Sequence, residues 1–236
     1  MMLDMLTVTP KAMPMLTDIH QLRLLQLSSV SLPVGGFAFS QGLESSIDLG
    51  WVRTKSDTFE ALSLQLTEGL GRLDLPLLQR AMHSFGQTDL KALAQWNDLA
   101  LACRETQELR LTDTAMGKAL ARLLRSLDIE LPFSPEEPLS FVTGYAMAAS
   151  HWGIPFHTAA LGFSWAWLEN QIAAATKLVP LGQTDAQRLL GELQPLIPEA
   201  IALATTLEDD DIGACLPALA IASCYHETQY SRLFRS

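Results

Sequence analysis

Residues 138–168 read PLSFVTGYAMAASHWGIPFHTAALGFSWAWL and contain no Asp, Glu, Lys or Arg. An apolar run of about 20 residues is long enough to cross a bilayer as a helix. Gly153 and Pro155 divide this run, because both residues interrupt a helix, and each half is then too short to span a membrane. We therefore expect two helices buried in a protein core or at a subunit interface, and no contact with a membrane.

Leucine and alanine dominate the 236-residue chain, with 43 Leu and 28 Ala against 6 Val and 9 Ile. Leu and Ala favour helices, whereas β-branched residues favour strands. Apolar residues at helical spacing support the same conclusion, because Phe59, Leu62, Leu66, Leu70 and Leu73 fall on one face of a helix. We predict an all-α fold: a single-domain, bundle-like array of about eight to eleven helices.

Capping residues predict where several of these helices begin. Asp18 with Gln21 matches a capping box and opens a first helix over roughly residues 18–30. Thr184 with Gln187 is a second match of the same kind.

Two acidic positions are further candidates for helix starts. Asp74, with Pro76 in the first turn, is expected to open a new helix. Asp210 or Asp211 is expected to cap the last helix, which runs to about Tyr225.

The two ends of the chain differ from the helical domain, which we place at 18–225. Residues 1–17 are rich in methionine and are expected to form a disordered leader. Asp4 and Pro10 interrupt the apolar stretch that a signal peptide needs. Residues 226–236 are expected to form a C-terminal tail that binds a partner.

Charge and cysteine content exclude several classes of protein. The chain has 16 basic and 26 acidic side chains, which give a net charge of −10, so a nucleic-acid partner is not expected. Cys103, Cys215 and Cys224 are odd in number and form no metal or disulfide pattern, which indicates a reduced, cytoplasmic setting.

Residue patterns for catalysis are weak. The histidines at 20, 83, 151, 157 and 226 lack the spacing of a metal site, and no nucleophile stands in a GxSxG motif. The acidic run at 208–211 resembles the magnesium-binding motifs of helical prenyl synthases, but such enzymes carry two of them. We therefore predict no enzyme activity, cofactor or resident metal. An all-α metal-dependent diphosphate-binding enzyme and a helical effector-binding regulator stay open as alternatives.

Two segments carry aromatic, glycine and arginine residues that a helical core does not require. They are SLPVGGFAFSQGLES at 31–45 and HETQYSRLFRS at 226–236. Aromatic and arginine side chains are common anchors of protein interfaces, so both segments are candidate binding surfaces.

Several blocks of this sequence together resemble one family, the urease accessory protein UreF family. The resemblance covers about nine tenths of the chain and rests on five blocks in order: LLQLSSVSLPVGGFAFSQGLE at 24–44, GWV at 50–52, RETQELR at 104–110, KLVPLGQTDAQR at 177–188 and HETQYSRLFRS at 226–236. It implies an all-α homodimer without catalytic activity. It also implies that the protein binds UreD (UreH in some species), recruits and modulates the nickel-carrying GTPase UreG, and assists nickel insertion into apo-urease.

The resemblance also suggests which residues contact partners, and it implies that the terminal block becomes ordered when a partner binds. The residues carried over are Pro33, Gly35, Gly36, Phe37, Ser40, Gln41, Gly42, Glu44, His226, Glu227, Tyr230, Ser231, Arg232 and Arg235. This sequence departs from many relatives by having Phe at positions 37 and 39, where a polar-tipped aromatic is common. A contact through a hydroxyl group is therefore not expected there.

Overall fold

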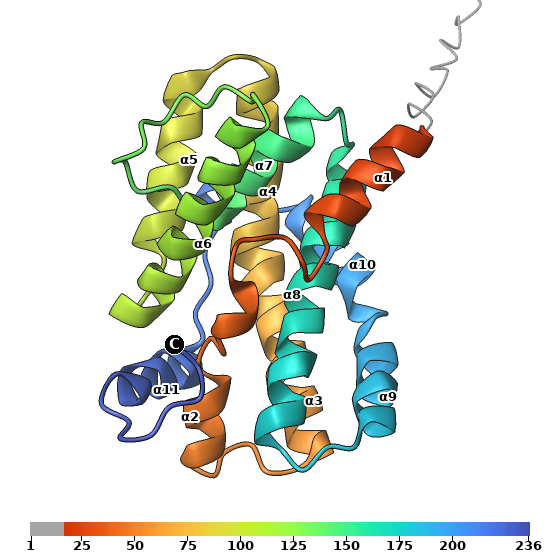
Figure 1. Cartoon of the computed structure of the whole chain (residues 1–236), viewed down its shortest axis with the longest axis vertical. Coiled ribbons are helices and arrows are strands. Elements are labelled where there is room, and N and C mark those ends of the chain that lie inside the picture. The colour runs from red at the N-terminus through yellow and green to blue at the C-terminus, as the bar shows by residue number, and fades with distance from the viewer. Residues whose placement is uncertain (1–16) are drawn as a thin grey trace, which may run out of the picture.

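The structure is a computed structural model that describes residues 17–236, in which all regular secondary structure is helical (Figure 1). The predicted all-α fold is confirmed. The α-helices in the first half are α1 Asp18–Leu27, α2 Leu43–Asp48, α3 Lys55–Leu64, α4 Leu75–Gly86, α5 Leu90–Ala102 and α6 Gln107–Ser126. Those in the second half are α7 Phe141–His151, α8 Phe156–Leu178, α9 Gln183–Leu193, α10 Leu196–Ala204 and α11 Pro217–Glu227. Residues 1–16 of the expected leader lie outside the described part.

The uncharged stretch forms the centre of the molecule. It folds into α7 and the first half of α8, and Gly153, with a φ of +65°, makes the turn between them. Residues 142–149 of α7 are all buried, because the helix packs between α4 and α6. The expectation of two helices in a core is confirmed, and no helix of residues 17–236 is long and apolar enough to span a membrane.

The predicted apolar face at 59–73 is also observed, but it belongs to a longer helical run than expected. Leu62, Leu66, Leu70 and Leu73 are buried on it. After Leu64 the backbone continues as a π-helix, η2 Gln65–Asp74, and passes directly into α4. α3 and α4 therefore form one rod, interrupted only by a stretch with a wider turn.

Asp74 does not open a separate helix as predicted. Its own backbone is helical, and its carboxylate makes no cap hydrogen bond. Instead, Asp74 Oδ1 accepts a hydrogen bond from Arg104 Nη2 at 2.5 Å. The Asp74 carboxylate therefore binds Arg104, between α5 and α6, and does not cap a helix.

Three other predicted caps differ from the structure. The first helix is capped by Thr17, one residue earlier than predicted, and α9 begins after Gly182 and includes Thr184 in its first turn. Asp210 and Asp211 lie in a short 3-10 turn, η3 Asp209–Asp211, several residues before α11 begins at Pro217.

One glycine permits the close approach of α6 to the segment that enters α7. A Cβ atom added to Gly117 would lie 2.0 Å from the carbonyl oxygen of Leu139. Side-chain hydrogen bonds hold the same segment, because Asn97 Oδ1 accepts from Ser140 N at 2.9 Å and Asp113 Oδ1 accepts from Phe141 N at 2.9 Å. The start of α7 is therefore fixed by α5 and α6 together.

We expect Gly117→Ala to lower the free energy of unfolding by about 3 kcal/mol, because main chain must move to admit the methyl group. Gly191→Ala is the matched control. Gly191 lies in α9 with nothing within 4 Å of an added Cβ, so the same change should stabilise the helix by about 0.5–1 kcal/mol. Urea denaturation measures both variants, and a shift of the same sign in the two would contradict the packing argument.

Candidate partner-binding site

The turn between α1 and α2 begins the site, and its backbone requires glycine. Gly35 and Gly42 have φ of +76° and +83°, in the left-handed region that other residues rarely adopt. A Cβ on Gly42 would also lie 2.7 Å from Leu219 Cδ1 on α11. Gly42 therefore lets the start of α2 lie directly against the last helix, and Figure 1 shows α2 and α11 side by side.

Glu44, in the first turn of α2, holds the C-terminal segment. The residue is 5% exposed. Its Oε1 accepts a hydrogen bond from Leu233 N at 2.6 Å, and its Oε2 accepts one from Phe234 N at 2.9 Å. The same Oε2 lies 3.1 Å from His226 Nε2. One carboxylate thus contacts both the main chain of the segment and the end of α11.

Glu108, in the first turn of α6, is the second buried carboxylate of the group. Its Oε2 lies 2.7 Å from Nδ1 of the fully buried His226, and its Oε1 accepts from Arg232 Nη1 at 3.0 Å. The two ring nitrogens of His226 thus face one carboxylate each, and Arg232 brings a guanidinium group to the same cluster.

The final residues close the site over the N-terminal turn. The main-chain oxygen of Ser236 accepts from Ser40 N at 2.5 Å, Ser40 Oγ at 3.0 Å and Gln41 N at 3.2 Å. Arg235 N donates to Ala38 O at 2.8 Å. The hydroxyl groups of Ser236 and Thr112 also form a hydrogen bond. Two segments nearly 200 residues apart in sequence are therefore joined through their main chains.

Phe234 adds an apolar anchor to these polar contacts. It is buried in a small cluster with Leu43 of α2, Ala175 of α8 and Val179, which follows α8 directly. The segment at 226–236, expected from sequence to be a tail outside the helical domain, is packed against α2, α6 and α8 in this structure. α11 extends to Glu227, two residues past the predicted boundary.

Side chains that point away from this support form the exposed face of the site. Phe37 is 66% exposed, Tyr230 is fully exposed and Leu233 is 63% exposed. Arg235 is exposed, with its guanidinium 5.7 Å from the ring centroid of Phe39. The remaining exposed residues among those predicted are Pro33, Glu227, Ser231 and Arg232.

Other predicted residues point inward. Gly36 faces the Asn170 side chain, and Gln41 Oε1 accepts from Trp167 Nε1 at 2.8 Å. Ser40, Gly42, Glu44 and His226 are buried. The structure thus divides the predicted set into a supporting group inside and a displayed group outside.

Glu108 and Thr112 take part in the site but were not singled out from the sequence. Glu108 lies within RETQELR, so a glutamate in a block that carries the family resemblance was the available signal. A further contact missed in the same way is the pair of buried hydroxyls of Thr106 and Ser223, 2.7 Å apart. These contacts join residues more than 100 positions apart, so the spacing of residues within one helix does not predict them.

Arg104 belongs to a second buried charge group beside the site. It pairs with Asp74 and with Asp113. The distance from Arg104 Nε to Asp113 Oδ2 is 3.2 Å. Burial by itself lowers the pKa of the guanidinium, but the charges of Asp113 and then Asp74 outweigh that effect and raise the pKa above its usual value. Arg104 therefore stays protonated and holds the α5–α6 connection to the rod.

Within 17–236 there is no group of three or more His, Cys, Asp or Glu side chains placed to hold a metal ion. Asp209 of the acidic run pairs with Arg80 Nε at 2.9 Å.

The fold and the site together define an all-α protein whose interlocked terminal segments display aromatic side chains on a rigid support. Comparison with known proteins gives the family. The UreF family model matches residues 52–194. A urease accessory protein UreF from Marinomonas sp. (strain MWYL1) is 61% identical over 93% of this chain and 96% of its own length. Those from Chromohalobacter salexigens and Hahella chejuensis are 50% and 48% identical, over 90% and 91% of this chain and 93% and 97% of their own lengths. The chain belongs to the UreF family of urease accessory proteins, as the sequence blocks predicted.

We expect Glu44→Ala to lower the free energy of unfolding by about 3–5 kcal/mol, because it leaves the amides of Leu233 and Phe234 and the Nε2 atom of His226 without their partner. Trypsin should also cleave more readily after Arg232, since the segment loses its main attachment. Glu192→Ala is the control, because Glu192 is half exposed and its ion pair with Lys55 contributes less than about 1 kcal/mol. Equal losses in the two variants, measured by urea denaturation, would refute the assigned role of Glu44.

Proposed function

We propose that this protein is a non-catalytic scaffold for urease maturation. It binds UreD (UreH), recruits the GTPase UreG and modulates it, and assists nickel insertion into apo-urease. It works as a homodimer in the cytoplasm. In this proposal nickel is cargo, and the chain contributes binding surfaces.

One observation carries the proposal: Phe37 and Tyr230 are exposed although the residues around them are locked in place. Large aromatic side chains are costly to leave in water, and they are among the commonest anchors of interfaces. Because Ser40, Glu44 and His226 fix the backbone beside them, their positions are set before a partner arrives. Less ordering entropy is then lost on binding.

The packed C-terminal segment modifies the mechanism expected from sequence. Residues 228–236 follow α11 and already contact α2 and the N-terminal turn within the isolated chain. We therefore expect recognition of a preformed surface, in which side chains adjust more than the backbone.

The acidic run gives little support to the diphosphate-binding alternative. Asp209 is engaged by Arg80, and the hydrogen bond from Arg80 Nη2 to Leu207 O at 2.6 Å fixes the turn nearby. Family membership also favours an accessory role.

The test uses Phe37→Ala and Tyr230→Ala, alone and together, in the full chain. Size-exclusion chromatography with purified UreD, and then with UreD and UreG, should show loss of complex formation in the double variant. We expect each truncation to weaken binding by about 2 kcal/mol, roughly thirty-fold, as for an interface anchor.

Leu90→Ala is the control, because Leu90 is also a large exposed apolar residue, 48% exposed, and lies at the start of α5, an element that does not contribute to the site. Circular dichroism checks that all variants keep their helices. Wild-type levels of both complexes in the double variant would show that these aromatic residues are not the docking anchors.

A further inference from the structure

The outer face of α6 is basic, although the chain as a whole is acidic. The charged side chains of α6 that reach solvent are all basic, namely those of Arg110, Lys118, Arg122 and Arg125. The two carboxylates of the same helix, those of Glu108 and Asp113, are buried and paired with His226, Arg232 and Arg104. The acidic groups of α6 are therefore used inside the fold, and the basic groups are displayed.

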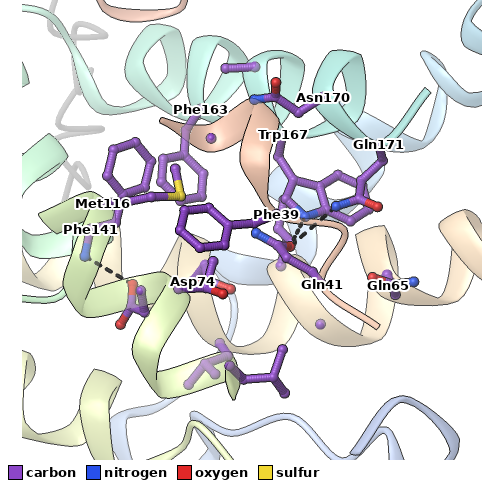
Figure 2. Close-up of a pocket in the computed structure, with 18 of the residues that line it drawn as sticks. Phe39, Gln41, Gln65, Asp74, Met116, Phe141, Phe163, Trp167, Asn170 and Gln171 are labelled. Atoms are coloured by element: carbon purple, nitrogen blue, oxygen red, sulfur yellow. Dashed lines mark hydrogen bonds between the residues drawn. The ribbon is translucent and has the colours of Figure 1, made fainter. Parts of the chain in front are cut away.

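Contacts on the inner face of α6 fix which side of the helix faces solvent. Leu120 and Leu124 are fully buried. Figure 2 shows Met116 beside Phe39, in the lining of a cavity of about 160 Å³ that α6 shares with α8 and the N-terminal turn. Gly117 lies against the segment that enters α7. The opposite side of α6 is thus left without a packing partner in the described chain.

The exposed side chains form one stripe along the helix. Leu111, Lys118, Arg122 and Arg125 follow each other at intervals of seven, four and three residues. Such intervals place them on one face, where residues three and four apart are neighbours. Leu111 is 49% exposed and adds an apolar contact near the start of the stripe. Because α6 has 20 residues, it presents a straight edge about 30 Å long.

The basic side chains of the stripe have no carboxylate partner within 17–236. No ion pair of Lys118, Arg122 or Arg125 is formed there, and Arg125 Nη2 instead donates to the carbonyl oxygen of Phe133 at 2.7 Å. The charges of the stripe are therefore available to another molecule.

The nearest acidic side chains do not cancel this charge. Glu136 and Glu137 border a recess of about 100 Å³ between α6 and the loop before α7. Glu137 Oε2 accepts a hydrogen bond from Ser134 N at 2.5 Å. When both glutamates are counted against the four basic residues of α6, a charge of +2 (4 − 2) is left, in a chain whose net charge is −10.

Stabilisation of α6 itself does not account for these residues. Basic side chains favour the negative end of a helix dipole, but the effect is confined to the last turn. Arg125 lies in the last turn, whereas Lys118 and Arg122 precede it. Arg110 lies near the start of α6, where the dipole disfavours a positive charge.

We infer that the outer face of α6, defined by Leu111, Lys118, Arg122 and Arg125, is a docking surface for an acidic helical segment of a protein partner. Carboxylates three and four residues apart on that segment pair with the basic side chains, and an apolar side chain covers Leu111. A nucleic acid fits less well, because a long polyanion would also meet the acidic surface around the stripe. The inference goes beyond the proposed function, because it involves neither Phe37 nor Tyr230.

The test uses two fluorescein-labelled peptides of 21 residues, three repeats of EAALEAA and three repeats of QAALQAA. Both peptides have the same leucines and a high helix propensity, so they differ in charge. Fluorescence anisotropy with the full wild-type chain at about 50 mM salt should show saturable binding of the acidic peptide, at least tenfold tighter than that of the neutral one. Raising the salt to about 300 mM should weaken the binding, because exposed charges are then screened.

Charge reversal locates the surface. Lys118→Glu together with Arg122→Glu should weaken binding of the acidic peptide at least tenfold. The matched control is Lys91→Glu together with Arg188→Glu, two exposed residues on α5 and α9. Both double variants have a net charge of −14 (−10 − 4), so repulsion by the whole chain is the same, and the control should change the affinity less than twofold.

Carbodiimide crosslinking gives a second readout that needs no variant. The reagent joins carboxylates to amines in direct contact, and Lys118 is the lysine of the stripe. Mass spectrometry should find the acidic peptide attached to Lys118 and not to Lys91 or Lys177, which are also exposed.

Four results would overturn the inference. Absence of saturable binding of the acidic peptide at low salt would mean that the stripe does not dock acidic segments. Equal losses in the two charge-reversed variants would show that overall charge governs binding. Crosslinks to Lys91 or Lys177 without any to Lys118 would place the peptide elsewhere. A DNA duplex that competes for the stripe more strongly than the acidic peptide would identify a nucleic acid as the partner.

Discussion

Two buried carboxylates, those of Glu44 and Glu108, constrain the arrangement of both ends of the described chain. Each residue is less than a tenth exposed, and a buried carboxylate without partners costs several kcal/mol. His226, Arg232 and two main-chain amides supply those partners, and all of them come from 226–236. These contacts therefore hold this segment against α2 and α6, and the exposed face of the site follows from that placement.

Pairing of buried charges also organises the structure around Arg104. Arg104 links the rod, through Asp74, to α6, through Asp113, and Asp113 uses its other oxygen to hold the start of α7. The start of α7 is thus tied to this charge group, so changes at Asp74 or Asp113 would affect how α6 and α7 pack on the rod.

How much of this could be predicted depends on the range of the interactions involved. The helices with apolar residues at regular spacing were predictable because the signal is local, as for Leu62, Leu66 and Leu70. Helix ends were less predictable, because carboxylates that resemble caps do not cap helices. Asp74 pairs with Arg104, and Asp210 and Asp211 lie in a 3-10 turn before α11. The π-helix keeps its leucines on the buried side and so looked like an ordinary helix. The residues of the two terminal blocks were found by family resemblance, but the pairing of His226 and Arg232 with Glu108 joins positions that no sequence pattern relates.

The contact between Ser40 and Ser236 spans 196 positions of sequence, which gives it a consequence for synthesis in the cell. Domains acquire structure as the chain leaves the ribosome, N-terminal part first. The turn at 31–42 and α2 emerge early, yet the residues that satisfy Glu44 and Ser40 emerge only after α11. The surface that includes Phe37 therefore cannot take its final form before residues 226–236 have been made. A protein that recognises this surface would bind chains that contain 226–236 and not shorter ones.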